Sequence, residues 1–204
     1  MTKIKLCGLK RIEDIEYVNQ YQPDYIGFVF ARSSRFIDDT VALQLKHKLD
    51  ERIQAVGVFV NEPMGHIVSL CRNKVIDVVQ LHGDEDEAYI SKLKEFISNP
   101  IIKAIRVQSR EQIKAAQSLP VDYLLLDTYQ KAQYGGSGIA FDHRIIPKCS
   151  KPFFLAGGLN KENIVTAIKD SNPYCIDVSS GVETDGVKDE EKIKEIIGMV
   201  RYMK

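Results

Sequence analysis

Phe153-Phe154-Leu155-Ala156-Gly157-Gly158 is an apolar run that ends in two glycines, and Ile176-Asp177-Val178-Ser179-Ser180-Gly181-Val182-Glu183 repeats this pattern further along the chain. Each run predicts a buried strand that leads into a phosphate-binding loop. Small residues let the backbone approach an anion closely, and unpaired N–H groups at the following turn favour negative charge. In barrels of alternating parallel strands and helices, the loops after the seventh and eighth strands frequently form one phosphate site. The two runs therefore predict such a barrel and a phosphorylated ligand.

Eight short apolar or β-branched runs recur along the chain and predict strands. They are Ile4–Cys7, Tyr25–Phe30, Ala55–Val60, Val78–Leu81, Ile101–Val107, Tyr123–Leu126, Phe153–Ala156 and Tyr174–Val178. Segments with apolar residues at helical spacing lie between them, for example Ile90, Leu93 and Ile97. This alternation predicts right-handed crossovers and a parallel sheet that is buried on both faces. Eight such units in 204 residues predict a (βα)8 TIM barrel, an α/β fold, that forms a single domain over residues 1–204.

An open doubly wound sheet is the competing architecture. In that fold the first strand leads into a Gly-x-Gly-x-x-Gly turn when it binds a dinucleotide. Here Cys7-Gly8-Leu9-Lys10 follows the first strand, so the barrel is favoured.

The composition excludes several classes of partner. Lys and Arg number 28 and Asp and Glu number 28, which gives a formal net charge of zero. A nucleic-acid or anionic-membrane protein would carry a basic surface, and no apolar segment approaches the roughly 18 residues of a membrane helix. Because the start of the sequence also lacks the apolar core of a secretory signal, a cytoplasmic protein is expected. The four cysteines lack metal-binding spacing, which predicts reduced thiols and no metal site. They are Cys7, Cys71, Cys149 and Cys175.

Two of the residues at the C-terminal strand ends are candidates for catalysis, since the active face of a barrel is built there. Asp127 ends an apolar strand, where desolvation raises a carboxyl pKa toward general-acid use. Its alternative role is to bind loop amides. Cys7 is by itself more typical of a small buried side chain than of a catalyst. His82 and Arg106, which also end strands, are interpreted as a packing histidine and an ion-paired arginine.

Strand parity places Lys5 on the same face as Cys7, whereas Ile4 and Leu6 face the helix layer. A lysine inside a barrel needs an anionic partner, because an unpaired buried charge is costly. The partner is predicted to be Asp127 or Asp177, and the lysine is then expected to favour the Cys7 thiolate. The alternative is a hydrated ammonium at the barrel end.

Two further segments carry weaker signals. Thr128–Ile139 contains Gly135-Gly136-Ser137-Gly138 and is either a lid after the sixth strand or a solvent-exposed loop. Lys188-Asp189-Glu190-Glu191-Lys192 is predicted to be a solvated helix face.

Several motifs, taken in order, closely resemble the phosphoribosylanthranilate isomerase family of tryptophan biosynthesis, and together they cover nearly the whole chain. They are Lys3-Ile4-Lys5-Leu6-Cys7-Gly8-Leu9, Gln80-Leu81-His82-Gly83, Leu126-Asp127, Gly135-Gly136-Ser137-Gly138 with Phe141-Asp142, Ala156-Gly157-Gly158-Leu159 and Asp177-Val178-Ser179-Ser180-Gly181-Val182-Glu183. The resemblance implies a cofactor-free and metal-free Amadori rearrangement of N-(5-phosphoribosyl)anthranilate to 1-(o-carboxyphenylamino)-1-deoxyribulose 5-phosphate. It also implies a general acid at Asp127 and a general base at Cys7.

The resemblance further implies a binding site for a small phosphoribosyl substrate. Arg35 is expected to meet the anthranilate carboxylate, a task that suits the guanidinium fork. Asp177 is expected to support the phosphate-side loops or touch the ribose. The phosphate is expected at Gly157, Gly158, Ser179, Ser180 and Gly181, with Cys7 and Asp127 at the opposite lip. The protein is expected to be a monomer or a homodimer.

Two other functions remain as alternatives. The phosphosugar isomerase of histidine biosynthesis performs the same rearrangement, but that family pairs two aspartates, and Cys7 stands where the first would be. A non-catalytic barrel that only binds a phosphorylated ligand is the second alternative. The presence of both Cys7 and Asp127 argues against it.

Overall fold

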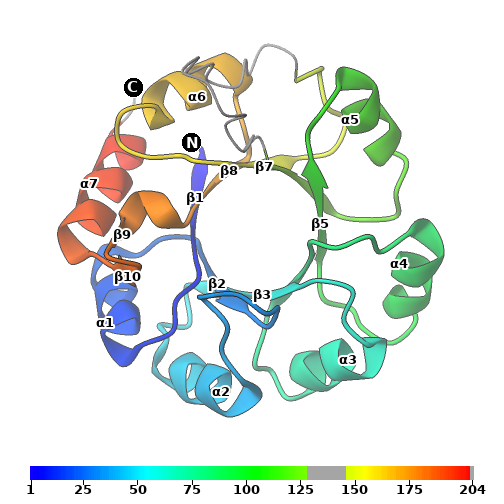
Figure 1. Cartoon of the computed structure of the whole chain (residues 1–204), viewed down its shortest axis with the longest axis horizontal. Helices are drawn as coiled ribbons and strands as arrows, with labels where there is room; N and C mark the ends of the chain where they lie inside the picture. The colour runs from blue at the N-terminus through cyan, green and yellow to red at the C-terminus, as the bar shows by residue number, and fades with distance from the viewer. Residues whose placement is uncertain (128–145, 203–204) are drawn as a thin grey trace.

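Eight parallel strands close into a barrel in the order β1 to β8, and helices surround it (Figure 1). The structure is a computed structural model that describes residues 1–127 and 146–202. The strands are β1 (Lys3–Cys7), β2 (Tyr25–Val29), β3 (Gln54–Phe59), β4 (Val78–Leu81), β5 (Ile101–Arg106), β6 (Tyr123–Asp127), β7 (Phe153–Ala156) and β8 (Cys175–Val178). The predicted TIM barrel is confirmed, and each predicted strand agrees with the observed one to within one residue at either end.

The helices and a small hairpin follow the strands. They are α1 (Ile12–Tyr21), α2 (Asp39–Lys48), α3 (Met64–Arg72), α4 (Glu87–Lys94), α5 (Arg110–Ala116), α6 (Ile164–Ser171) and α7 (Glu190–Arg201), with the short 3-10 helix η2 (Ser180–Val182) and the strands β9 (Glu183–Thr184) and β10 (Val187–Lys188). None of these helices is long and apolar enough to cross a membrane. The cytoplasmic location stays a prediction, and the candidate lid Thr128–Ile139 lies outside the described residues.

Several helices begin at a side chain that caps the first free backbone amides. Asp38, Asp86, Ser109 and Asp189 each accept a hydrogen bond from the amide of the third residue after them. A cap of this kind satisfies an amide that has no partner within the helix, and its loss costs about 1 kcal/mol. The charged segment that follows β10 therefore begins with a cap, because Asp189 starts α7.

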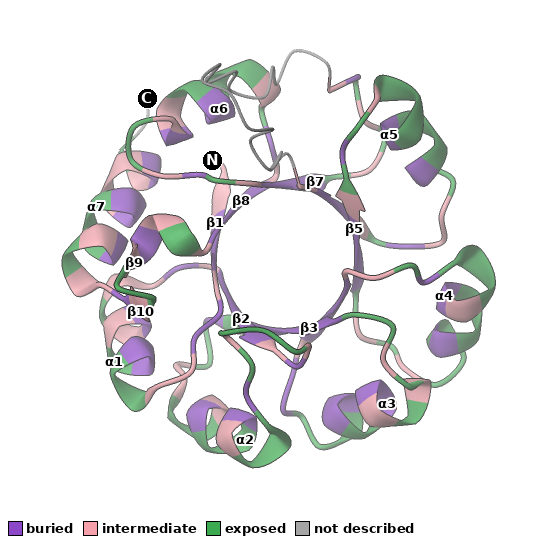
Figure 2. Ribbon diagram, viewed as in Figure 1, coloured by how far each residue is buried: buried purple, intermediate pink, exposed green. Residues whose placement is uncertain are grey.

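The alternation of side chains along each strand divides the apolar residues into two cores. Ile4 and Leu6 belong to the outer core between barrel and helices, as parity predicted. The inner core contains Val56, Leu125 and Phe154 among others. In Figure 2 most of the barrel wall is buried, and the helices are buried on the side that faces it. Lys5 lies on the inner face of β1, where its neighbour in the β1–β8 register is Asp177.

His66 on α3 joins two neighbouring segments through both of its ring nitrogens. Its Nδ1 lies 2.8 Å from Glu62 Oε1, and its Nε2 lies 2.8 Å from Asp39 Oδ1. Burial by itself lowers the pKa of His66, but the two carboxylates more than offset this, and the pKa is raised above its ordinary value of 6.5. The imidazolium form therefore links α2 to the β3–α3 turn.

Replacing His66 by glutamine is expected to lower the free energy of unfolding by about 0.5–1 kcal/mol at pH 6. Because the folded-state pKa is raised, this stabilisation is complete below pH 6.5 and is lost as the pH rises through the folded value. Urea unfolding of both proteins at pH 6 and pH 9 measures it, with H47Q, on the exposed side of α2, as the control. An H66Q effect of equal size at both pH values would contradict the charged link.

Candidate active site

A cavity of about 460 Å³ opens at the C-terminal ends of the strands. This volume is in the range of small-molecule sites. Eight of the nine predicted site residues line it: Cys7, Arg35, Asp127, Gly157, Gly158, Asp177, Ser179 and Ser180. The ninth, Gly181, lies beside them on η2, where a Cβ would collide with the carbonyl oxygen of Leu159. The strand-end residues are thus brought to one place by barrel closure.

Lys5 pairs with Asp177 at the floor of this cavity. The Lys5 side chain is fully buried, and its Nζ lies 2.7 Å from Asp177 Oδ2. This confirms the prediction of an anionic partner and selects Asp177 over Asp127. The other carboxylate oxygen, Asp177 Oδ1, is buried and has no hydrogen-bond partner among the described residues. Asp177 also lines the cavity, so the Lys5–Asp177 pair lies at its edge.

The ionisation of Cys7 is set by opposing effects. Burial raises the pKa of the thiol, whereas the positive charge of Lys5 lowers it, and the net result is a raised pKa. Lys188 also acts to lower the pKa of Cys7. Lys5 therefore favours the thiolate, as predicted, but burial has the larger effect, so the pKa of Cys7 stays above its ordinary value.

Cys7 lies directly beside the loop that follows β8, which contains Ser179 and Ser180. Because β1 pairs with β8, the end of β1 meets the residues that follow β8. The hydroxyl of Ser179 donates to the Cys7 carbonyl oxygen at 3.0 Å. The expectation that Cys7 stands at the opposite lip from the glycine loops is wrong, since closure of the barrel makes the first and last strands neighbours.

Asp127 lies at the end of β6 and is accompanied by a histidine. His82 Nε2 is 3.6 Å from Asp127 Oδ2, and His82 Nδ1 is 3.0 Å from Gln80 Nε2. His82 also lines the cavity, so its interpretation as a packing residue is wrong. The alternation of side chains along β4 would have indicated this position. Val78 lies in the inner core, and Gln80 and His82 follow at two-residue intervals on the same face.

The two predicted glycine loops adopt the backbone geometry of a cradle. Gly157 and Gly158 have φ values of 105° and 66°, which side-chain-bearing residues rarely adopt. Asn163 donates to the Gly158 carbonyl at 3.0 Å and holds this loop in place. Ser180 begins η2, and residues from the ends of β7 and β8 lie together in the lining of the cavity. This arrangement suits an anion.

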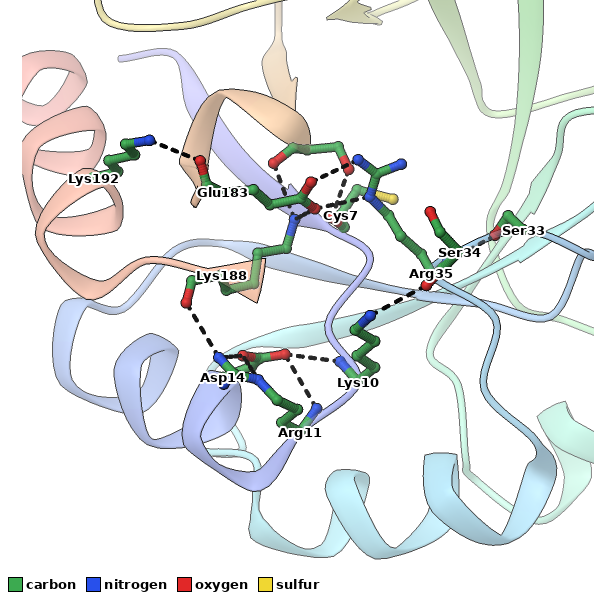
Figure 3. Close-up of polar contacts among 11 residues, drawn as sticks. Cys7, Lys10, Arg11, Asp14, Ser33, Ser34, Arg35, Glu183, Lys188 and Lys192 are labelled. Carbon is green, nitrogen blue, oxygen red and sulfur yellow. Dashed lines mark hydrogen bonds and ion pairs between the residues drawn. The ribbon is translucent and has the colours of Figure 1, made fainter. Parts of the chain in front are cut away.

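Arg35 approaches the same cavity from the β2–α2 loop, where it forms a two-pronged ion pair. Its Nε and Nη2 donate to the two carboxylate oxygens of Glu183 at 2.8 and 2.7 Å. Glu183 also accepts from Lys188 Nζ at 2.7 Å (Figure 3). Lys188 is only 4% exposed, so the interpretation of its segment as a solvated face is wrong at this residue. Neither Glu183 nor Lys188 was assigned a role from the sequence.

The comparison with known families decides the identity of this fold and site. The sequence model of the family described as N-(5'phosphoribosyl)anthranilate (PRA) isomerase matches residues 4–199. The chain belongs to this family. The resemblance seen in the motifs is thereby confirmed, and the match includes every predicted site residue of this phosphoribosylanthranilate isomerase.

Individual relatives agree with the family assignment. The N-(5'-phosphoribosyl)anthranilate isomerase of Endomicrobium trichonymphae is 53% identical over 203 residues, which cover all of both chains. The crystal structure of phosphoribosyl anthranilate isomerase from Thermotoga maritima superimposes with a TM-score of 0.86 at 33% identity and full coverage of both chains. Another structure of the family, in complex with reduced 1-(o-carboxyphenylamino)-1-deoxyribulose 5-phosphate, gives a TM-score of 0.82 at 32% identity, again with full coverage.

The cavity of this isomerase is lined by ionisable side chains. Across residues 1–127 and 146–202, no group of three or more His, Cys, Asp or Glu side chains gathers where it could hold a metal ion. The ionisable side chains that line the cavity include Cys7, His82, Asp127 and Asp177, with Arg35 at the rim. They are the kinds of group that move protons and bind anions.

Proposed function

We propose that this isomerase, as one domain of 204 residues, rearranges N-(5-phosphoribosyl)anthranilate to 1-(o-carboxyphenylamino)-1-deoxyribulose 5-phosphate with Asp127 as general acid and Cys7 as general base. The observation that carries the residue roles is that both side chains line one cavity with the glycine cradle. A solved family structure that contains the reduced form of this ketose supports the substrate.

The cradle formed by Gly157, Gly158 and the start of η2 takes the phosphate. It holds the end of the substrate that does not react, so that the ribose lies over the barrel mouth between Cys7 and Asp127. Asp177, which lines the cavity and is held by Lys5, lies beside the ribose. The aromatic carboxylate then meets Arg35 at the rim.

The first chemical step opens the furanose ring. Asp127 gives its proton to the ring oxygen, the bond between C1 and that oxygen breaks, and its electron pair stays on the oxygen as a hydroxyl. The lone pair of the anthranilate nitrogen forms the C1=N bond in the same step, so the product is a protonated Schiff base and the Asp127 carboxylate. His82 Nε2, at 3.6 Å from Asp127 Oδ2, faces the carboxylate that forms.

The second step moves hydrogen from C2. The Cys7 thiolate takes the C2 proton, the C–H electrons form a C1=C2 bond, and the C=N electrons return to nitrogen to give an enolamine. Protonation at C1 and loss of the C2 hydroxyl proton then give the ketone. The charges of Lys5 and Lys188 oppose the effect of burial and support the thiolate that this step needs.

Replacing Arg35 by methionine is expected to raise KM by about tenfold to a hundredfold with a smaller change in kcat, because a charge-assisted pair to the substrate carboxylate is lost before the chemical steps. Steady-state kinetics with freshly prepared substrate measures both constants. R110M, on the exposed side of α5, is the matched control. A normal KM in R35M would place the carboxylate elsewhere.

Turnover of freshly generated phosphoribosylanthranilate, followed by the loss of anthranilate-type fluorescence, tests the proposed function. Wild type is expected to convert it catalytically. Binding of the reduced product without turnover would instead support a non-catalytic ligand-binding barrel. Turnover of the histidine-pathway substrate at a comparable rate would widen the function to both rearrangements.

A further inference from the structure

Glu183 is the centre of a charge network at the rim of the active site. Its carboxylate accepts two hydrogen bonds from Arg35 and one from Lys188, all between 2.7 and 2.8 Å. The Glu183 side chain is 8% exposed, whereas that of Arg35 is 30% exposed. Figure 3 shows Glu183 between the two cations, with Cys7 close to Arg35. The buried Glu183 carboxylate therefore holds the Arg35 guanidinium, which reaches solvent.

The network keeps one unit of positive charge at the rim. Burial raises the pKa of Glu183, but the hydrogen bonds from Arg35 and Lys188 outweigh this and lower it to about 2. The carboxylate is thus ionised at neutral pH. Arg35 and Lys188 carry two positive charges and Glu183 one negative charge, so the three together carry a net charge of +1, which an anionic ligand can meet.

The contact with Glu183 uses only one edge of the guanidinium. Nε and Nη2 form the side edge, and both donate to Glu183. Nη1 makes no hydrogen bond within the described parts of the chain. The end edge, formed by Nη1 and the second hydrogen of Nη2, is therefore open to a second carboxylate in the same fork geometry.

Other contacts fix the position of both side chains. The Arg35 stem packs against Gly8, which has a φ of +87° and where a Cβ would collide with Arg35 Cδ. Lys188 Nζ also donates to the carbonyl oxygen of Ser179 at 3.0 Å, and Lys192 Nζ donates to the Glu183 carbonyl oxygen at 2.7 Å. Glu183 is thus tied to the phosphate-side loop on one side and to Arg35 on the other.

We infer that Glu183 is a positioning residue for substrate recognition: it holds the side edge of Arg35 so that the end edge binds the aromatic carboxylate at a set distance from the phosphate cradle. The inference rests on the proposed role of Arg35. Glu183 itself does not touch the reacting atoms. Its contribution is to the binding of ligands that carry both a phosphate and the aromatic carboxylate.

Two ligands that differ in a single group test this role. The first is reduced 1-(o-carboxyphenylamino)-1-deoxyribulose 5-phosphate, and the second is its counterpart with phenyl in place of o-carboxyphenyl. Calorimetry gives the dissociation constant of each for wild type, E183Q, R35M and the control E191Q, whose side chain is 78% exposed on α7. Glutamine keeps the shape of Glu183 but presents N–H groups to the two cations.

We expect E183Q to weaken binding of the carboxylate-bearing ligand by about tenfold or more and to leave the carboxylate-free ligand nearly unchanged. Unchanged binding of the second ligand also shows that the variant is folded. E191Q is expected to match wild type. The double variant E183Q/R35M is expected to bind the first ligand no more weakly than R35M alone, because both changes remove one interaction.

The outcomes separate the inference from the proposed function. If wild type and R35M bind both ligands alike, the role of Arg35 fails and the inference fails with it. If R35M loses the preference for the carboxylate-bearing ligand and E183Q keeps it or strengthens it, only the positioning role is overturned. Equal weakening of both ligands by E183Q would show a general structural role and would also overturn the inference.

Discussion

Replacing Cys7 by alanine lowers kcat by about 10²- to 10⁴-fold, the usual contribution of a general base, while the reduced product analogue still binds. The loss is expected because, among the described residues, no other cysteine lines the cavity to replace the thiolate. Asp127→Asn is expected to show a loss of the same order, since the amide has no acidic proton for the ring oxygen. Fluorescence-detected turnover gives kcat and KM, and calorimetry gives the affinity for the analogue.

Matched controls separate lost chemistry from a disturbed fold. Cys149→Ala removes a half-buried thiol that donates to the Pro147 carbonyl oxygen and packs against the outer core, away from the strand ends that form the site. Asp170→Asn removes an exposed carboxylate at the end of α6. Both controls are expected to turn over like wild type. Activity within a few-fold of wild type in C7A or D127N would remove that residue from its proposed role.

Replacing Lys5 by methionine is expected to cost about 3–5 kcal/mol of unfolding free energy, because the Asp177 carboxylate is then buried without its partner. The Lys5 ammonium is fully enclosed and 2.7 Å from that carboxylate. Burial by itself lowers the pKa of Lys5, but Asp177 more than offsets this and holds the pKa above its ordinary value, so the lysine is charged when folded. For a chain of this size Tm should fall by roughly 10 °C. Urea unfolding and calorimetry measure the loss.

The double variant K5M/D177N distinguishes a lost ion pair from simple loss of packing. With both charges removed, the destabilisation should be clearly smaller than in K5M alone, since no unpaired charge remains inside the barrel. K169M, which changes an exposed lysine of α6, is the control and should be neutral. A double variant as unstable as the sum of the two single ones would show that the pair itself contributes little.

The strands and the two-sided core could be predicted because they depend on local pattern. Apolar runs bounded by small or polar residues located β1 to β8 to within one residue. Alternation along one strand was enough to place Ile4 outside and Lys5 inside the barrel. Parity also required an anionic partner for Lys5, but two candidates remained until the register of β1 against β8 selected Asp177.

The pairing of Arg35 with Glu183 could not be predicted from local sequence patterns. Arg35 and Glu183 are 148 positions apart, and nothing in the sequence around either one indicates the other. Lys188 lies in a segment of mixed charge, which predicted a solvated helix face. Its side chain is instead buried and paired with Glu183. These pairings arise because η2 and the β9–β10 hairpin fold back over the end of β1 and the β2–α2 loop.

The chain's own pattern of apolar runs, glycines and strand-end residues was sufficient for the barrel, the family and the set of residues at the active face. The barrel and its strand ends follow from side-chain periodicity and locally encoded backbone conformations, whereas the family was indicated by the resemblance of the motifs. Barrel closure and long-range ion pairing set the rest: Cys7 lies beside the phosphate loop, burial outweighs Lys5 in setting its pKa, and Glu183 holds Arg35. Desolvation and charge pairing depend on every neighbour in space, and those neighbours come from distant parts of the chain.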